Sequence, residues 1–304
     1  MKKIIFMGFA AICLSIIACS SSKTEDVNRD GMSFSLFSGI KASKTYITKK
    51  VKIKDISSIV NKSSLDVTYK HGSYPHVEMY MPDNVMSYIA LDTNNKELTI
   101  RLKENTIIRW RNNNKAKIIV YAPSVNNFSL IGSGNLTVSE TLNRKSCQFQ
   151  LSGSGNINLR DVKVSDNIKA NLAGSGNFNI LNMKTTADNG CIALSVSGSG
   201  NVNASEISTK SLTTGIAGSG NLNIATIITD SSTASITGSG NMKLKGRTNK
   251  ASFSVTGSGE ISAGTFKAKD VYASATGSGQ ITCYATGKTD FKSVHKSSII
   301  NVAK

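Results

Sequence analysis

The triplet Gly-Ser-Gly recurs eight times in the C-terminal part of this 304-residue chain. Its copies are almost evenly spaced, and the longest interval separates Gly174 from Gly198. A fixed period of about 20 residues indicates a solenoid, in which each repeat forms one turn that can bury its apolar face only against its neighbours. The repeated glycines are Gly132, Gly134, Gly153, Gly155, Gly174, Gly176, Gly198, Gly200, Gly218, Gly220, Gly238, Gly240, Gly257, Gly259, Gly277 and Gly279.

Side-chain alternation around the triplets favours β-strands. In the stretch Val255–Ile261, alternation places both glycines and the apolar ends inward, and Thr256, Ser258 and Glu260 outward. Inward glycines are expected where the wall leaves no room for a side chain, or where the chain bends at positive φ. We therefore predict an all-β chain whose residues 128–304 form a parallel β-helix with two or three short strands per turn.

The residue after the triplet is Asn in six of the eight copies, and then becomes Glu260 and Gln280. Stacked Asn amides can hydrogen-bond from turn to turn and stabilise the solenoid. A regular polar row could also bind a repetitive ligand such as a glycan. Calcium-binding β-rolls need an Asp in each turn, so no metal is expected at this row. The predicted Asn ladder consists of Asn135, Asn156, Asn177, Asn201, Asn221 and Asn241.

The N-terminus has the pattern of a bacterial export signal. Lys2 and Lys3 precede a short apolar run that ends in Ala18-Cys19. A small residue before a cysteine is typical of a lipoprotein, in which the cysteine thiol is acylated. We predict a signal peptide over residues 1–18, lipidation at Cys19, and a flexible polar tether over 19–40.

Residues 41–127 are β-rich but irregular. All three prolines of the chain lie before the first triplet, and turn residues separate short alternating runs. A solenoid needs its open end covered, because bare strand edges aggregate. The section is therefore interpreted either as irregular first turns or as a cap on them.

Arg109-Trp110-Arg111 is the most conspicuous local run in the irregular section. An indole between two guanidinium groups could stack on a sugar or lie at a membrane interface, so these residues are a candidate binding site. The alternative is an ordinary strand with a buried ring.

The formal charge of +17 is spread along the chain, with 15 basic against 7 acidic residues in 41–127 and 17 against 9 in 128–304. Such an excess favours weak binding to anionic surfaces, or solubility alone.

No catalytic or metal-binding residue set stands out. The chain has three histidines, and no spacing of His, Cys or Glu resembles a zinc site. No phosphate-binding or dinucleotide motif is complete, so no cofactor is predicted. Cys147, Cys191 and Cys283 are odd in number, so no closed disulfide framework is expected. Cys147 and Cys191 are expected to be unpaired, buried small side chains, because they lie two turns of the solenoid apart, which exceeds disulfide reach.

The sequence resembles a known family at several places. Ile56–Val60, Leu65–Gly72, Val77–Pro82, Ile118–Pro123 and Leu130–Asn135 carry the resemblance, which spans roughly residues 45 to 285. The family is the "putative auto-transporter adhesin, head GIN domain" family, common in Bacteroidetes lipoproteins. It implies a right-handed parallel β-helix at the cell envelope and supplies no catalytic residues. Gly287–Lys304 departs from the pattern, because it has no further triplet.

These features favour a non-catalytic lipoprotein of the outer membrane that is displayed at the cell surface for adhesion or for contact with glycans. Its expected partners are the membrane, through the lipid anchor, and glycans or other envelope components; nucleic acid is not expected for an exported lipoprotein. One alternative is a periplasm-facing structural or sensory lipoprotein. A third hypothesis is a polysaccharide-degrading β-helix enzyme, for which no charged cluster is identified.

Overall fold

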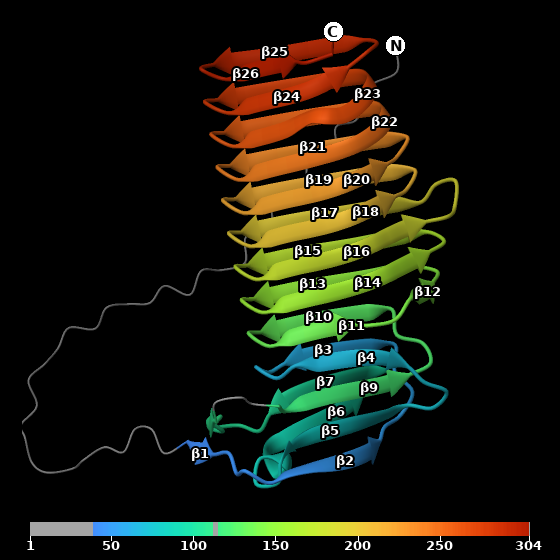
Figure 1. Cartoon of the computed structure of the whole chain (residues 1–304), viewed down its shortest axis with the longest axis vertical. Coiled ribbons are helices and arrows are strands. Elements are labelled where there is room, and N and C mark those ends of the chain that lie inside the picture. Colours follow the sequence, from blue (N-terminus) through green and yellow to red (C-terminus); the bar gives the residue numbers. More distant parts are fainter. Residues whose placement is uncertain (1–38, 112–114, 304) are drawn as a thin grey trace, which may run out of the picture. The chain divides into compact units, whose positions relative to one another are not determined.

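The computed structural model describes residues 39–111 and 115–303. The predicted signal peptide, Cys19 and nearly all of the predicted tether lie outside these ranges. Gly39–Lys304 forms one compact unit. It is an all-β parallel solenoid with two strands per turn (Figure 1), as the repeat predicts. A 3-10 turn, η1 (Met86–Tyr88), interrupts the strands, and no helix in the described ranges is long and apolar enough to cross a membrane.

The strands before each triplet form the first wall of the solenoid, and they pair in parallel and in register from turn to turn. Inward residues such as Leu151, Leu172 and Val196 are buried in a continuous core. The strands are β10 (Asn127–Gly132), β13 (Cys147–Gly153), β15 (Asn167–Gly174), β17 (Cys191–Gly198), β19 (Ser211–Gly218) and β21 (Ser231–Gly238).

The strands after each triplet form the second wall, again parallel and in register. The long strands β22 (Asn241–Gly257) and β23 (Glu260–Gly277) run from the second wall around the far corner into the first wall of the next turn. The other second-wall strands are β11 (Asn135–Val138), the short β12 (Leu142–Arg144), β14 (Asn156–Val164), β16 (Asn177–Thr185), β18 (Asn201–Ser208), β20 (Asn221–Ile228) and β24 (Gln280–Ala285).

The Gly-Ser-Gly triplets form the corner between the walls, and they stack directly on one another. Gly218 has φ +128°, a conformation that L side chains rarely adopt. Ser219 and Gly220 both donate their backbone N–H to the carbonyl of Gly198, at 3.0 Å. A Cβ on Gly240 would lie 2.6 Å from the Gly220 carbonyl oxygen and 2.7 Å from a methyl of Ile216. The first glycine of each triplet is required by its positive φ and by the backbone of the previous turn. The second glycine is required by that backbone and, after the first triplet, by a core side chain.

The opposite corner carries a column of buried threonines. Thr185 and Thr209 lie 2.7 Å apart between hydroxyl oxygens, and Thr229 donates to the backbone carbonyls of Lys210 and Ser231. Thr248 continues the column and donates to the carbonyl of Lys250. The hydroxyls of Thr229 and Thr248 therefore satisfy backbone carbonyls at the bend between the two walls.

The irregular section pairs with the first repeat turn through parallel strands. β3 (Ser58–Lys62) pairs with β10 on one side and with β7 (Glu97–Leu102) on the other. β4 (Val67–His71) likewise lies between β11 and β9 (Lys117–Ala122). The chain thus reaches the turn next to the repeats before it builds the turn farther away.

Antiparallel strands close this end of the stack. β6 (Ile89–Asn94) pairs with β7, and β5 (His76–Pro82) pairs with β9. β2 (Tyr46–Lys52) pairs with β5 and is the outermost strand of this sheet. A separate two-stranded sheet joins β1 (Ile40–Lys41) to β8 (Ile108–Arg109).

The last turn of the solenoid contains no triplet. β25 (Thr289–His295) pairs with the second half of β23, and β26 (Ser298–Asn301) pairs with β24. His295 aligns with Gly277 and keeps a left-handed backbone, with φ +67°. Residues 289–301 therefore reproduce the turn and its corner without glycine.

The cysteines are free, as the sequence predicts, but only two of the three are buried. In the backbone register, Cys147 of β13 lies beside the buried Ile168 of β15, whereas Cys191 of β17 lies beside the exposed Asn167 of β15. Cys191 is thus one residue out of register with the inward column, which turns it toward the outer face. The expectation of a buried side chain is wrong for Cys191.

Candidate functional site

The second wall has a lengthwise crease. The second-wall strands β14, β16, β18 and β20 each contain two consecutive outward residues, as at Arg160 and Asp161 between the buried Leu159 and Val162. A straight strand alternates its faces, so two outward neighbours mark a local bend. Residue pairing between turns skips the first residue of each outward pair. Because the bend recurs in register, the creases join into one groove.

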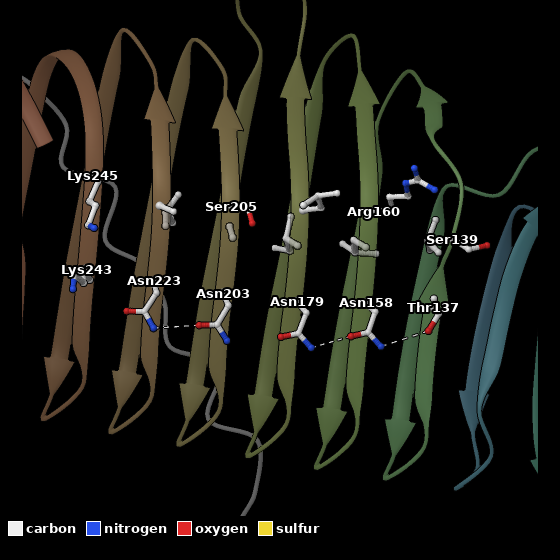
Figure 2. Close-up of a pocket in the computed structure, with 17 residues that line it drawn as sticks. Thr137, Ser139, Asn158, Arg160, Asn179, Asn203, Ser205, Asn223, Lys243 and Lys245 are labelled. Carbon is white, nitrogen blue, oxygen red and sulfur yellow. Dashed lines mark hydrogen bonds between the residues drawn. The ribbon is translucent and has the colours of Figure 1, made fainter. Parts of the chain in front are cut away.

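The groove follows the stack for six turns, which is about 24 Å at the spacing of neighbouring strands. It has a volume of about 780 Å³. Figure 2 shows its lining residues as two rows that cross the strands. The row nearer the Gly-Ser-Gly corner is Thr137, Asn158, Asn179, Asn203, Asn223 and Lys243, which we call the inner row. The row along the crease is Ser139, Arg160, Leu181, Ser205, Ala225 and Lys245, which we call the outer row.

The inner row is a second Asn ladder, but it is broken in the middle. Asn179 donates its amide to Asn158 at 2.9 Å, and Asn223 donates to Asn203 at 3.2 Å (Figure 2). Among the described residues, no hydrogen bond joins Asn203 to Asn179. The Asn203 amide N–H groups and the Asn179 carbonyl oxygen are therefore not used by the ladder at this point.

The floor between the rows is apolar and is lowest where the ladder breaks. Ile180 and Ile224 form the floor on either side of Ala204, whose side chain is far smaller. On the outer row, Leu181 remains 48% exposed and offers apolar surface to a ligand. The middle of the groove thus combines a small side chain below, an exposed leucine beside it and unused amide groups above.

The charged residues of the groove are all cationic. Arg160 lies toward one end, where it forms an ion pair with the adjacent Asp161 at 3.6 Å, and Lys243 and Lys245 lie at the other. The groove ends at β22, where pairing shifts between Ile224 and Ile227 because β22 has one residue fewer. The described lining residues include no Asp, Glu, His or Cys, so the groove offers binding groups but no acid–base pair.

The ladder that the sequence predicts lies beside the Gly-Ser-Gly corner. Asn156 donates to Asn135 at 2.8 Å, and the same bond recurs through Asn177, Asn201, Asn221 and Asn241 at 2.7 to 3.2 Å. Asn135 itself donates to the Asp66 carboxylate, which extends the row into the irregular section. These amides are engaged with one another from Asn135 to Asn241, so the row mainly stabilises the corner.

The second ladder was missed by sequence reasoning, although its signal is present. Four copies read Gly-Ser-Gly-Asn-x-Asn, with the second Asn at positions 158, 179, 203 and 223. The pattern places both Asn side chains on the outer face, two residues apart. The crease beside this row, which makes the row one wall of a groove, is not marked by any recurring residue type in the sequence.

Arg109, Trp110 and Arg111 lie far from the groove, in and just after β8. Together with Lys41 they line a hollow of about 530 Å³ at the N-terminal end. Arg111 donates to the carbonyl of Ala42, and the partly buried Trp110 packs against the core. Within the described ranges, no group of three or more His, Cys, Asp or Glu side chains is placed to hold a metal ion.

Burial raises the pKa of two cysteine thiols. Desolvation raises the pKa of Cys147 to about 12, and the nearby Arg144 only partly opposes this effect. Desolvation also raises the pKa of Cys283. Both thiols therefore stay protonated near neutral pH, which favours a packing role over a nucleophilic one.

Comparison with known proteins finds one matching family model and several solved structures. The family model described as "putative auto-transporter adhesin, head GIN domain" matches residues 55–227 and 191–303. No curated protein is significantly similar in sequence.

Three of the solved structures that share the fold come from Parabacteroides. A "putative adhesin" from Parabacteroides distasonis is 19% identical, with a TM-score of 0.63 over 87% of this chain and 100% of that one. A "putative adhesin" from Parabacteroides merdae is 21% identical, with a TM-score of 0.61 over 87% and 99%. A "putative lipid binding protein" from P. distasonis is 21% identical, with a TM-score of 0.57 over 86% and 99%.

Proposed function

This chain belongs to the "putative auto-transporter adhesin, head GIN domain" family, and from that premise we propose that it is a non-enzymatic envelope protein that binds an extended glycan along its groove. The single observation that carries the proposal is the groove itself. It is long and shallow, its floor is apolar, its inner row is made of amides, and its charged groups are cationic.

The inner row suits a ligand that carries many hydroxyl groups. An Asn side chain has two N–H donors and two acceptor lone pairs, and a ladder bond uses one of each. Every Asn of the row therefore keeps at least one donor and one acceptor for a ligand. These groups recur at the spacing of the turns, about 4.8 Å, which favours an extended ligand with a short chemical repeat.

The floor and the cations narrow the ligand class further. Sugar rings present apolar C–H faces, which can pack on Leu181 and on the floor around Ala204. Lys243 and Lys245 favour a polymer that carries carboxylate, sulfate or phosphate groups, whereas the charge of Arg160 is shared with Asp161. We therefore propose an acidic polysaccharide as the preferred ligand.

A glycan array probed with residues 39–304, followed by calorimetry on the best binders, tests the proposal. All described strand pairings and the whole core lie within this piece, so it contains the contacts that define the body. The combined substitution N179A and N203A should weaken binding about fivefold per lost hydrogen bond, at about 1 kcal/mol each. K243Q with K245Q should weaken only the binding of acidic polymers.

The matched control is N177A combined with N201A. These residues lie in the same two turns and are of the same type, but they belong to the corner ladder outside the groove. Equal losses in both double variants, or no binding to any acidic polysaccharide, would refute the groove as a glycan site. Displacement by a fatty acid would instead favour a lipid ligand on the apolar floor, as the description of one similar structure suggests.

We further propose that the protein is anchored in the outer membrane by acylation of Cys19 and is displayed at the cell surface. The adhesin-type family supports an envelope location, and the leader sequence supports the anchor. C19A should release the protein from the membrane fraction. Protease treatment of intact cells should then clip the anchored body; protection until the outer membrane is permeabilised would favour the periplasm-facing alternative.

A further inference from the structure

The N-terminal end of the solenoid carries a basic and apolar surface that the groove does not use. We propose that this end docks directly on the surface of an anionic phospholipid bilayer. The surface, called the basal end below, consists of β1, β2 and β8 with the residues that adjoin them, 42–45, 53–54, 107 and 110–111. Figure 1 shows β1 and β2 at the opposite end of the stack from β25 and β26.

Positive charge is concentrated at the basal end by the fold. Residues 40–54 contain six lysines and no acidic residue, and β2 lies within this stretch. All six lysines are exposed, and of these only Lys50 forms an ion pair with a described residue, Glu78, at 3.6 Å. The pairing of β1 with β8 then brings Lys41 beside Arg109. The lysine-rich stretch 40–54 and Arg109 therefore lie together at one end of the body.

Apolar and aromatic groups lie among these charges. Ile107 is 57% exposed and Ile47 is 41% exposed, although each belongs to or adjoins a strand of the basal end. Trp110 is partly buried and lines the hollow with Lys41, Arg109 and Arg111. Indole rings and long cationic side chains are the groups that favour the interface between lipid headgroups and acyl chains.

The connection of the chain supports a membrane as the partner. The body begins at Gly39, next to β1, so the chain that precedes it joins the body at the basal end. An acyl anchor at Cys19 would be tied to this end by about 20 residues, which span at most about 70 Å. The anchor keeps the basal end close to the bilayer, and basic residues add attraction to anionic headgroups.

Lysines on an outermost strand also have a structural explanation, because they discourage pairing with other chains. That explanation predicts no affinity for lipid and does not require exposed Ile107 or the Arg-flanked indole. Membrane docking and edge protection can thus be separated by a binding experiment.

Trp110 is the only tryptophan in the chain, so its fluorescence reports on the basal end alone. Residues 39–304 are titrated with vesicles of phosphatidylcholine, with and without phosphatidylglycerol, at low salt. We expect sedimentation with the anionic vesicles, a blue shift of Trp110 emission, and reversal of both by added salt. K41Q combined with K49Q should lower the partition coefficient about 25-fold, which is fivefold, or about 1 kcal/mol, per lysine.

The matched control is K169Q combined with K184Q, which removes two exposed lysines from the walls of the solenoid. This control should change the partition coefficient less than twofold. Equal losses in the two double variants would assign binding to net charge and overturn the proposal. The absence of an emission shift with anionic vesicles would also overturn it, as would a shift caused by an acidic polysaccharide but not by vesicles.

Discussion

The corner glycines provide the sharpest test of how the stack is built. Gly218 ends β19 at φ +128°, and a Cβ there would lie 2.5 Å from the Gly198 carbonyl oxygen of the previous turn. Gly215 lies three residues earlier on the same strand, and a Cβ there would meet only the Ser235 hydroxyl oxygen, at 3.6 Å. Alanine at these two positions therefore separates the effect of the corner from the general effect of replacing glycine.

The cost of G218A follows from three contributions. A side chain in this conformation costs about 1–3 kcal/mol, and forcing a methyl against the neighbouring backbone costs about 1–3 kcal/mol more. Alanine also lowers the conformational entropy of the unfolded chain, which offsets about 0.4–1 kcal/mol of this loss of stability. The expected loss is therefore about 3 kcal/mol, which lowers the melting temperature of a domain of this size by roughly 6–12 °C. G215A should instead stabilise the protein by about 0.4–1 kcal/mol.

Both variants are compared with the parent by circular dichroism during urea and thermal unfolding. A loss below about 1 kcal/mol for G218A, or equal effects of the two substitutions, would show that the turns can move apart to admit a side chain. In that case the explanation of the repeated triplet by close stacking would be wrong.

Four further outcomes are expected. N177A removes two ladder bonds and N241A removes one, so the first should cost about 2 kcal/mol and the second about 1 kcal/mol in chemical denaturation; equal losses would count against the ladder. Because the folded pKa of Cys147 is raised to about 12, its thiol should resist iodoacetamide at pH 9 while the half-exposed Cys191 reacts, as read by mass spectrometry. The stability that the protonated Cys147 confers is fully present below pH 9, its unfolded value, and should be lost as pH rises toward 12. H295G should relieve left-handed strain in the last turn and stabilise it by about 0.5 kcal/mol in thermal unfolding.

The repeating features of the fold could be predicted from the sequence. The period of the triplets, the inward glycines and the alternation around them each describe contacts within one turn or between adjacent turns. Leu151, Leu172 and Val196 are buried as the alternation predicts, because each copy places the same residue at the same point of the turn. Because every turn repeats the same pattern, the inward residues predicted for one turn hold for the whole solenoid.

Features that depend on several strands bending together could not be predicted. Cys191 is a different case: it lies seven residues before its triplet, whereas Cys147 lies six residues before its own, so alternation counted back from the triplet turns Cys191 outward. The crease of the second wall depends on a bend that β14, β16, β18 and β20 repeat in register. A single strand with two outward residues does not reveal a groove.

The sequence by itself determined that the chain is a β-solenoid with glycine corners and polar rows, because these properties recur in every turn. Only the tertiary structure decided which row lines a groove and which residues join the lysine-rich stretch 40–54 at the end of the stack. The inner row becomes a binding wall because neighbouring strands bend together. Lys41 and Arg109 become neighbours because β1 pairs with β8, although the two strands are far apart in the sequence. Such contacts arise from the pairing of distant strands, and no local pattern of residues encodes them.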